Sequence, residues 1–234
     1  MRFGTIYAAL ALTAALFSNQ AAAAPATASY NLFTDFGSSA FSYGSTGALG
    51  GAFTEFATVY HFNGFDLHSS DPLAQWGVGV TGNSEYGSLA RNAVSVNPDQ
   101  LGSYAVIRFV AQFTGTYTVG GAFTAEDGFG QTSVDVHILG GGSSLFSGIQ
   151  NSGSAPTLVS GLSVFLQQGQ TIDFAVGNGG SPAGYYTDFT RVDGSITGIA
   201  AAVPEPETYA MFGVGLLAVG AVARRRKGSG STAA

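Results

Sequence analysis

Residues 104–123 read YAVIRFVAQFTGTYTVGGAF, and their hydrophobic side chains recur at every second position. Alternate side chains of an extended strand point to the same side, so this pattern predicts two β-strands. The first strand, over 104–113, is expected to turn one set of side chains inward: Ala105, Ile107, Phe109, Ala111 and Phe113. The second begins at Gly115 and is expected to bury Tyr117, Val119, Gly121 and Phe123. The short connection between the strands predicts a hairpin.

Further short strands, separated by turns, are predicted on both sides of this stretch. Residues 52–62 alternate, and a strand near 133–138 is expected to turn Val134, Val136 and Ile138 inward and Asp135 and His137 outward. Four more short strands are expected at 145–146, 162–166, 172–176 and 189–196. About eight or nine strands at this spacing predict an all-β fold, an antiparallel β-sandwich of the jelly-roll type, forming one domain over residues 25–202.

Four strand-and-turn segments within residues 97–197 give this domain a family resemblance. They are Gly115–Val119, Val134–Ile138, Gly169–Gly177 and Tyr186–Thr190. The region resembles a jelly-roll module common in extracellular bacterial proteins and is similar to carbohydrate-binding β-sandwiches. The resemblance implies an extracellular polysaccharide as a partner.

The composition excludes several classes of protein. The chain has no cysteine, which excludes disulfides, thiol catalysis and cysteine-ligated metal sites. Residues 25–202 hold twelve acidic and three basic residues, a net charge of −9. A surface of this sign does not favour nucleic acid as a partner.

The first 24 residues have the layout of a secretory signal peptide. Met1-Arg2 is followed by an apolar run over 6–17 and by the small residues Ala21–Ala24 before Pro25. We therefore expect residues 1–24 to form a signal helix that signal peptidase removes during export.

A second targeting segment is predicted over residues 203–227. Pro204, Glu205 and Pro206 precede an apolar stretch over 209–223. A basic block of Arg224, Arg225, Arg226 and Lys227 follows it. A helix of this length covers about 22 Å, short of a bilayer core, and predicts a weak, transient inner-membrane anchor. Residues 228–234 are expected to form a disordered tail.

This order of features resembles the PEP-CTERM sorting signal of Gram-negative bacteria. The resemblance implies recognition by an exosortase, removal of the tail, and release or transfer to the cell surface. Proteins with this signal usually accompany exopolysaccharide production and biofilm formation. The sequence thus favours a secreted, non-enzymatic protein of the cell surface or the matrix.

An enzymatic alternative rests on a single pair of residues. Asp135 and His137 lie two apart on one strand face and could form a carboxylate-oriented base. An extracellular hydrolase acting on matrix glycans or esters is therefore the second hypothesis. The run 77–82 matches the dinucleotide-binding fingerprint, but no helix pattern follows it, so a turn-rich loop is predicted there.

Two ligand sites are predicted, each with a simpler alternative. Structural calcium would be bound by acidic side chains, with the solvation of an acidic surface as the alternative. The candidate ligands are Asp188, Asp193, Asp173 and Asp35. Glycan contacts would be made by aromatic side chains in loops, with burial in the core as the alternative. The candidates are Trp76, Tyr185 and Tyr186. No other cofactor is expected.

Overall fold

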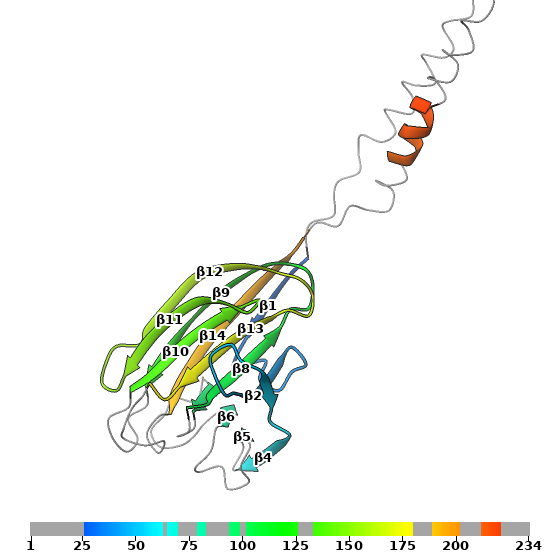
Figure 1. Ribbon diagram of the computed structural model, residues 1–234. Helices are drawn as coiled ribbons and strands as arrows, with labels where there is room; N and C mark the ends of the chain where they lie inside the picture. Colours follow the sequence, from blue (N-terminus) through cyan, green and yellow to red (C-terminus); the bar gives the residue numbers. More distant parts are fainter. Residues whose placement is uncertain are drawn as a thin grey trace, which may run out of the picture. The chain divides into compact units, whose positions relative to one another are not determined.

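The computed structural model describes residues 26–62, 65–69, 79–82, 94–98, 102–125, 133–179, 189–201 and 212–220. The chain divides into two compact units, Met1–Ala200 and Ala201–Ala234. The described residues of the first unit form two antiparallel β-sheets (Figure 1). This arrangement confirms the predicted antiparallel β-sandwich.

One sheet, called sheet A here, has eight strands. Its order is β12-β9-β14-β7-β6-β5-β4, and β1 also pairs with β14. The strands are β1 (Thr27–Asn31), β4 (Thr58–Phe62), β5 (Phe65–Ser69), β6 (Gly79–Gly82), β7 (Val94–Asn97), β9 (Gly115–Ala125), β12 (Thr157–Leu166) and β14 (Thr190–Ala200). Strand β14 pairs along its whole length with β9, while β1 and β7 divide its other edge between them.

The other sheet, sheet B, has six strands in the order β11-β10-β13-β8-β2-β3. They are β2 (Phe41–Thr46), β3 (Phe53–Glu55), β8 (Tyr104–Val110), β10 (Ser133–Gly140), β11 (Ser143–Asn151) and β13 (Thr171–Gly177). The last two strands in the sequence therefore belong to different sheets, β13 to sheet B and β14 to sheet A.

The core lies between the two sheets. The rings of Phe109 on β8 and Tyr117 on β9 have centroids 5.6 Å apart, and those of Phe123 on β9 and Phe146 on β11 are 6.3 Å apart. Most of the side chains predicted to point inward are buried: Ala105, Ile107, Phe109, Ala111, Tyr117, Val119, Phe123, Val134, Val136 and Ile138. The alternation in the sequence therefore identified the inner faces of β8, β9 and β10.

The predicted hairpin of residues 104–123 is wrong, because β8 belongs to sheet B and β9 to sheet A. The connection between them turns from one sheet to the other. The Ala111 amide donates a hydrogen bond to the Gln170 carbonyl, and the Ala111 carbonyl accepts one from the Gly169 amide. The Tyr117 hydroxyl donates to the Phe113 carbonyl at 2.7 Å. These bonds satisfy the backbone at the corner, so the two strands need not pair with each other.

The described residues contain fourteen strands, more than the eight or nine predicted. The additional ones are mostly short strands of the N-terminal half. One of them is β6, Gly79–Gly82, which lies in the run predicted to be a turn-rich loop. It pairs with β5 on one side and with β7 on the other. The strand is short and has a glycine at each end, and glycine is depleted in strands, so its pattern predicted a loop.

The second unit contains a helix over residues 212–220. Its large side chains, including Phe212, Leu216 and Leu217, are exposed. Among the described residues, no helix has both the length and the hydropathy required to cross a bilayer.

Candidate functional site

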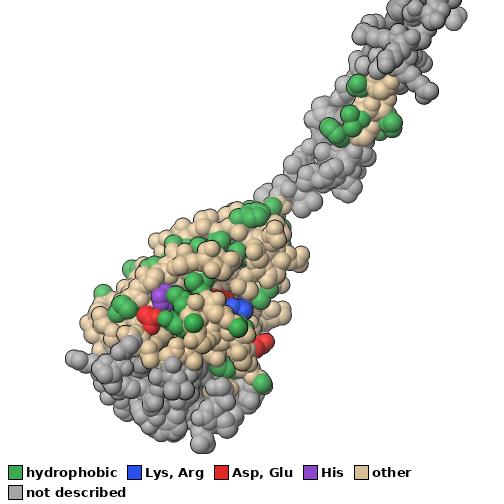
Figure 2. Space-filling model, viewed as in Figure 1, with side chains coloured by type: hydrophobic (Ala, Val, Ile, Leu, Met, Phe, Trp, Pro, Cys, Tyr) green, Lys and Arg blue, Asp and Glu red, His purple; other side chains and the backbone are tan. Residues whose placement is uncertain are grey.

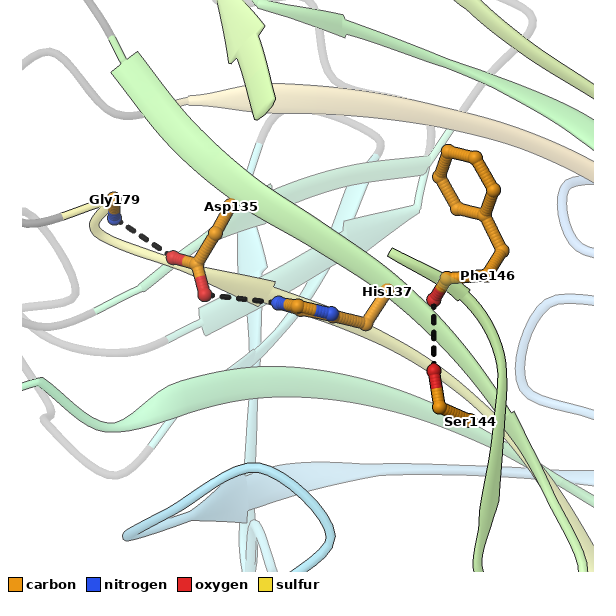
Figure 3. A network of polar contacts seen from close by, with 5 residues as sticks. All are labelled: Asp135, His137, Ser144, Phe146 and Gly179. Atoms are coloured by element: carbon orange, nitrogen blue, oxygen red, sulfur yellow. Dashed lines mark hydrogen bonds and ion pairs between the residues drawn. The ribbon is translucent and has the colours of Figure 1, made fainter. Parts of the chain in front are cut away.

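A polar cluster lies on the outer face of sheet B, where β8 and β10 carry Tyr104, Asp135 and His137. Asp135 and His137 are two residues apart on β10, as predicted, and therefore share a face. His137 Nε2 and Asp135 Oδ2 are 2.9 Å apart, and the amide of Gly179 donates to Asp135 Oδ1 at 2.7 Å (Figure 3). The Tyr104 ring meets the His137 ring edge-on, with centroids 5.7 Å apart.

The hydrogen bonds of this cluster keep Asp135 ionised. Burial alone would raise the pKa of Asp135, but hydrogen bonds from His137, Tyr104 and Gly179 outweigh it and lower the pKa to about 2. The same arrangement, through burial and the hydrogen bond to Asp135, raises the pKa of Tyr104 to about 12. At neutral pH the cluster therefore presents a carboxylate beside a neutral phenol.

The prediction that His137 points to solvent is only partly correct. Its side chain lies on the outer face but is only 9% exposed. Nε2 is bound to Asp135, and Nδ1 is buried without a hydrogen-bond partner among the residues that the structure describes. A general base needs one ring nitrogen directed at its substrate, so this geometry does not favour His137 as a base.

A second polar group on the same face joins β8, β13 and β3. Arg108 forms a bidentate pair with Asp173, with Nε to Oδ1 at 2.8 Å and Nη2 to Oδ2 at 2.7 Å. The guanidinium also lies 4.0 Å from the centre of the Phe53 ring. On the face seen in Figure 2, a histidine, acidic and basic side chains lie near one another with hydrophobic side chains between them. Arg108 thus connects the centre of sheet B to its edge strand.

The connection between β2 and β3 covers part of this outer face. A Cβ atom at Gly50 would be 3.9 Å from Leu139 Cδ1 on β10, although four strand pairings separate β3 from β10. Val106 and Ala175, on the same outer face, are each 1% exposed. Within the polar cluster on this face, the Asp135 side chain is 19% exposed.

The predicted calcium ligands are not gathered in the described part of the chain. Asp173 is paired with Arg108, Asp193 with Arg191 at 3.0 Å, and Asp35 accepts the amide of Asn31 at 2.8 Å. No group of three or more histidine, cysteine or acidic residues there could hold a metal ion. Asp188 lies outside the described residues, and calcium binding stays a prediction.

The other predicted site residues also lie outside the described residues. These are the aromatic residues Trp76, Tyr185 and Tyr186, the residues Pro204, Glu205 and Pro206, and the basic residues Arg224, Arg225 and Arg226. The signal peptide over 1–24 and the tail over 228–234 lie outside them as well. These assignments are not tested by the geometry.

Sequence reasoning missed Tyr104, Arg108 and Phe53. Arg108 interrupts an apolar strand and is one of only three basic residues between positions 25 and 202, a signal that could have been used. A charged side chain in such a strand usually needs a partner of opposite charge. Its pairing with Asp173 depends on the register of β8 and β13, which the sequence does not reveal.

The chain has low-identity similarity to several solved structures. One is the GH26-CBM35 β-(1,4)-mannanase of Podospora anserina, at 20% identity and a TM-score of 0.29, covering 62% of this chain and 29% of that one. Another is the CBM22 tandem domain of Paenibacillus barcinonensis Xyn10C, at 11% identity and a TM-score of 0.39, covering 80% and 50%. A third is the carbohydrate-binding module CBM36 in complex with calcium and xylotriose, at 16% identity and a TM-score of 0.25, covering 47% and 82%.

The chain thus spans less than a third of the mannanase and half of the tandem domain. The comparison with curated proteins gives no match. One family model matches, over residues 202–227, which include the Pro204-Glu205-Pro206 run, the apolar stretch and the arginine block. The predicted sorting signal is thereby confirmed: the chain carries a PEP-CTERM protein-sorting motif.

Proposed function

We propose that this protein is exported, handled by an exosortase through residues 202–227, and acts outside the cell as a non-enzymatic polysaccharide-binding sandwich. The observation that carries the proposal is the sorting motif, which supports export and sorting to the cell surface of a Gram-negative bacterium. Its final place is the surface or the exopolysaccharide matrix of a biofilm. Signal peptidase, the exosortase and an extracellular polysaccharide are its partners.

The geometry of sheet B supports binding rather than catalysis. An ionised Asp135 can accept a further hydrogen bond from a sugar hydroxyl, and Tyr104, whose hydroxyl donates to Asp135, can accept one and offer an aromatic face. His137, in contrast, has one nitrogen bound by Asp135 and the other buried. The hydrolase hypothesis would require His137 to move before it could accept a proton.

The proposed glycan contacts extend this site along the chain. Asp135 accepts a hydrogen bond from the amide of Gly179, and Tyr185 and Tyr186 follow Gly179 by only a few residues in the sequence. We assign Tyr185, Tyr186 and Trp76 to stacking against sugar rings, since aromatic side chains in loops on a rigid scaffold are suited to this contact. A bound calcium ion would be an additional structural element of the mature protein.

Sorting is tested by replacing Pro204, Glu205 and Pro206 with alanine in a host that has an exosortase. We expect the variant to stay in the membrane fraction while the wild-type protein reaches the surface or the medium. Deleting the exosortase gene should produce the same retention for the wild-type chain. Normal release of the variant contradicts the assignment.

Binding is tested with the mature protein and soluble matrix polysaccharides by isothermal titration calorimetry. Tyr185→Ala combined with Tyr186→Ala should weaken binding at least tenfold, the effect of losing about 1.4 kcal/mol. Val59→Ala, which shortens an exposed hydrophobic side chain on β4, is the matched control. If the mature protein binds no soluble polysaccharide, the proposed role is wrong. Ester or glycan turnover that disappears in His137→Ala would favour the hydrolase instead.

A further inference from the structure

The outer face of sheet A carries a grid of hydroxyl side chains, which we call the hydroxyl face. It is formed where β12, β9, β14 and β1 lie side by side. One row across these strands is Phe165, Thr116, Ile199 and Thr27, and the next is Ser163, Thr118, Thr197 and Ser29. The two rows contain six hydroxyl-bearing side chains and two apolar ones.

Burial confirms that these side chains point away from the core. Along β9, Thr116 and Thr118 are exposed while the intervening Tyr117 is completely buried. Phe165 is 59% exposed and Ile199 47% exposed, unusually high for large apolar side chains. The grid therefore belongs to the accessible surface and not to the core.

The spacing of the grid is regular because it follows the β-sheet. Neighbouring strands lie about 4.8 Å apart, and side chains two residues apart on one strand are separated by about 6.7 Å. Ser29 Oγ and Thr197 Oγ1, on adjacent strands, are 3.4 Å apart, so hydroxyls of one row come within reach of each other. Such rows offer donors and acceptors at repeating intervals.

The hydroxyl face carries no charge, although residues 25–202 carry a net charge of −9. Arg191 and Asp193 lie further along the same side of β14, but they neutralise each other in an ion pair of 3.0 Å. Removing hydroxyl groups from water costs far less than removing ions, so this surface suits a neutral ligand. An acidic or basic polymer would gain no ion pair from it.

We infer that the hydroxyl face binds a neutral, insoluble polysaccharide whose sugar chains pack side by side. Rows of hydroxyls would exchange hydrogen bonds with the hydroxyls of the sugar chains, and Phe165 and Ile199 would cover their apolar C–H faces. A second copy of this chain fits less well, because stable self-interfaces have a largely apolar centre, whereas the centre of this face is Thr116 and Thr118. The inference rests on the proposed extracellular location but assigns a surface on the opposite sheet from the Tyr104–Asp135 cluster.

The test is adsorption of the mature protein to microcrystalline cellulose and to insoluble chitin, both neutral, with alginate beads as the acidic polymer. The wild-type protein should adsorb to at least one neutral polymer and not to alginate. Thr118→Lys, which places a charge in the middle of the grid, should lower the partition coefficient at least tenfold. Phe165→Ala should lower it about tenfold, as expected for an aromatic contact at a binding surface.

Thr54→Lys is the matched control, because Thr54 is an exposed threonine on β3 of sheet B. It should adsorb like the wild-type protein, and circular dichroism should show that all variants are folded. The inference is overturned if the wild-type protein adsorbs to neither neutral polymer, or if Thr118→Lys and Phe165→Ala adsorb normally. It is also overturned if sedimentation shows a dimer that only Thr118→Lys disrupts.

The two binding proposals fail separately. Tyr185→Ala with Tyr186→Ala should affect soluble polysaccharides and leave adsorption to the insoluble polymer unchanged, and Thr118→Lys should do the reverse. If the wild-type protein binds no soluble polysaccharide, the binding function proposed for the Tyr104–Asp135 region is wrong. Normal adsorption in that case would leave the hydroxyl face supported.

Discussion

Replacing Asp135 with asparagine should destabilise the sandwich by an amount that depends on pH. The folded structure lowers the pKa of Asp135 from 3.8 to about 2, through hydrogen bonds that outweigh its burial. Each pKa unit corresponds to about 1.36 kcal/mol, so the ionised carboxylate contributes about 2 kcal/mol to the free energy of unfolding. Asparagine has nearly the shape of the protonated acid and loses this contribution.

The sign of the effect follows from the direction of the pKa shift. Since the folded-state pKa is lower than the unfolded-state value, the stabilisation is complete above about pH 4 and disappears as the pH falls through about 2. We therefore expect Asp135→Asn to lower the free energy of unfolding by about 2 kcal/mol at pH 7 and by almost nothing near pH 2.

The measurement is urea unfolding of both proteins at several pH values, followed by circular dichroism. Asp193→Asn is the matched control, because Asp193 forms a partly exposed ion pair with Arg191, which should contribute less than about 1 kcal/mol. A difference between wild type and Asp135→Asn that stays constant from pH 7 to pH 2 would refute this reasoning. So would the absence of any difference at pH 7.

Three further substitutions probe the packing of the sandwich. Arg108→Met should lower the free energy of unfolding by about 3 kcal/mol, because it leaves Asp173, which is 6% exposed, without its partner. Arg108→Lys should lower the free energy of unfolding by less, and thermal unfolding compares the two variants. Gly198→Ala should cost about 1–3 kcal/mol, because its Cβ would lie 2.6 Å from Tyr117 Cε1, and a midpoint in urea equal to that of the wild type would contradict this. Tyr117→Phe should cost about 1 kcal/mol through the lost hydrogen bond to the Phe113 carbonyl, and unchanged stability would show that water replaces it.

The sequence was sufficient for the class of fold and for the inner faces of several strands. Alternation in 104–123 and 133–138 reflects burial on one side of a strand, and burial is what the hydrophobic pattern records. The pairing of strands was not predictable in the same way. The Ala111–Thr114 connection is short enough for a hairpin, but β8 pairs with β13 and β9 with β14, so it is a corner between sheets.

The candidate site was predicted only where its residues are close in sequence. Asp135 and His137 are two positions apart, so their contact follows from strand geometry alone. Tyr104 and Arg108 reach Asp135 and Asp173 through the pairings of β8, β13 and β10, which bring together residues far apart in the chain. The hydroxyl face was missed for the same reason, since its rows run across four strands and no single strand reveals them.

The place of β14 in sheet A affects how the exported chain folds. This strand, Thr190–Ala200, lies between β9 on one edge and β1 and β7 on the other, and it comes just before the sorting motif. A chain that crosses a membrane from its N-terminal side delivers β14 after all the strands that depend on it. The full edge of β9 then lacks its partner until residue 200 has emerged, and such an edge can pair with other chains. Export from the N-terminus would therefore leave this edge unpaired until the strand directly before the sorting motif has emerged, so that the sandwich closes only as the motif arrives.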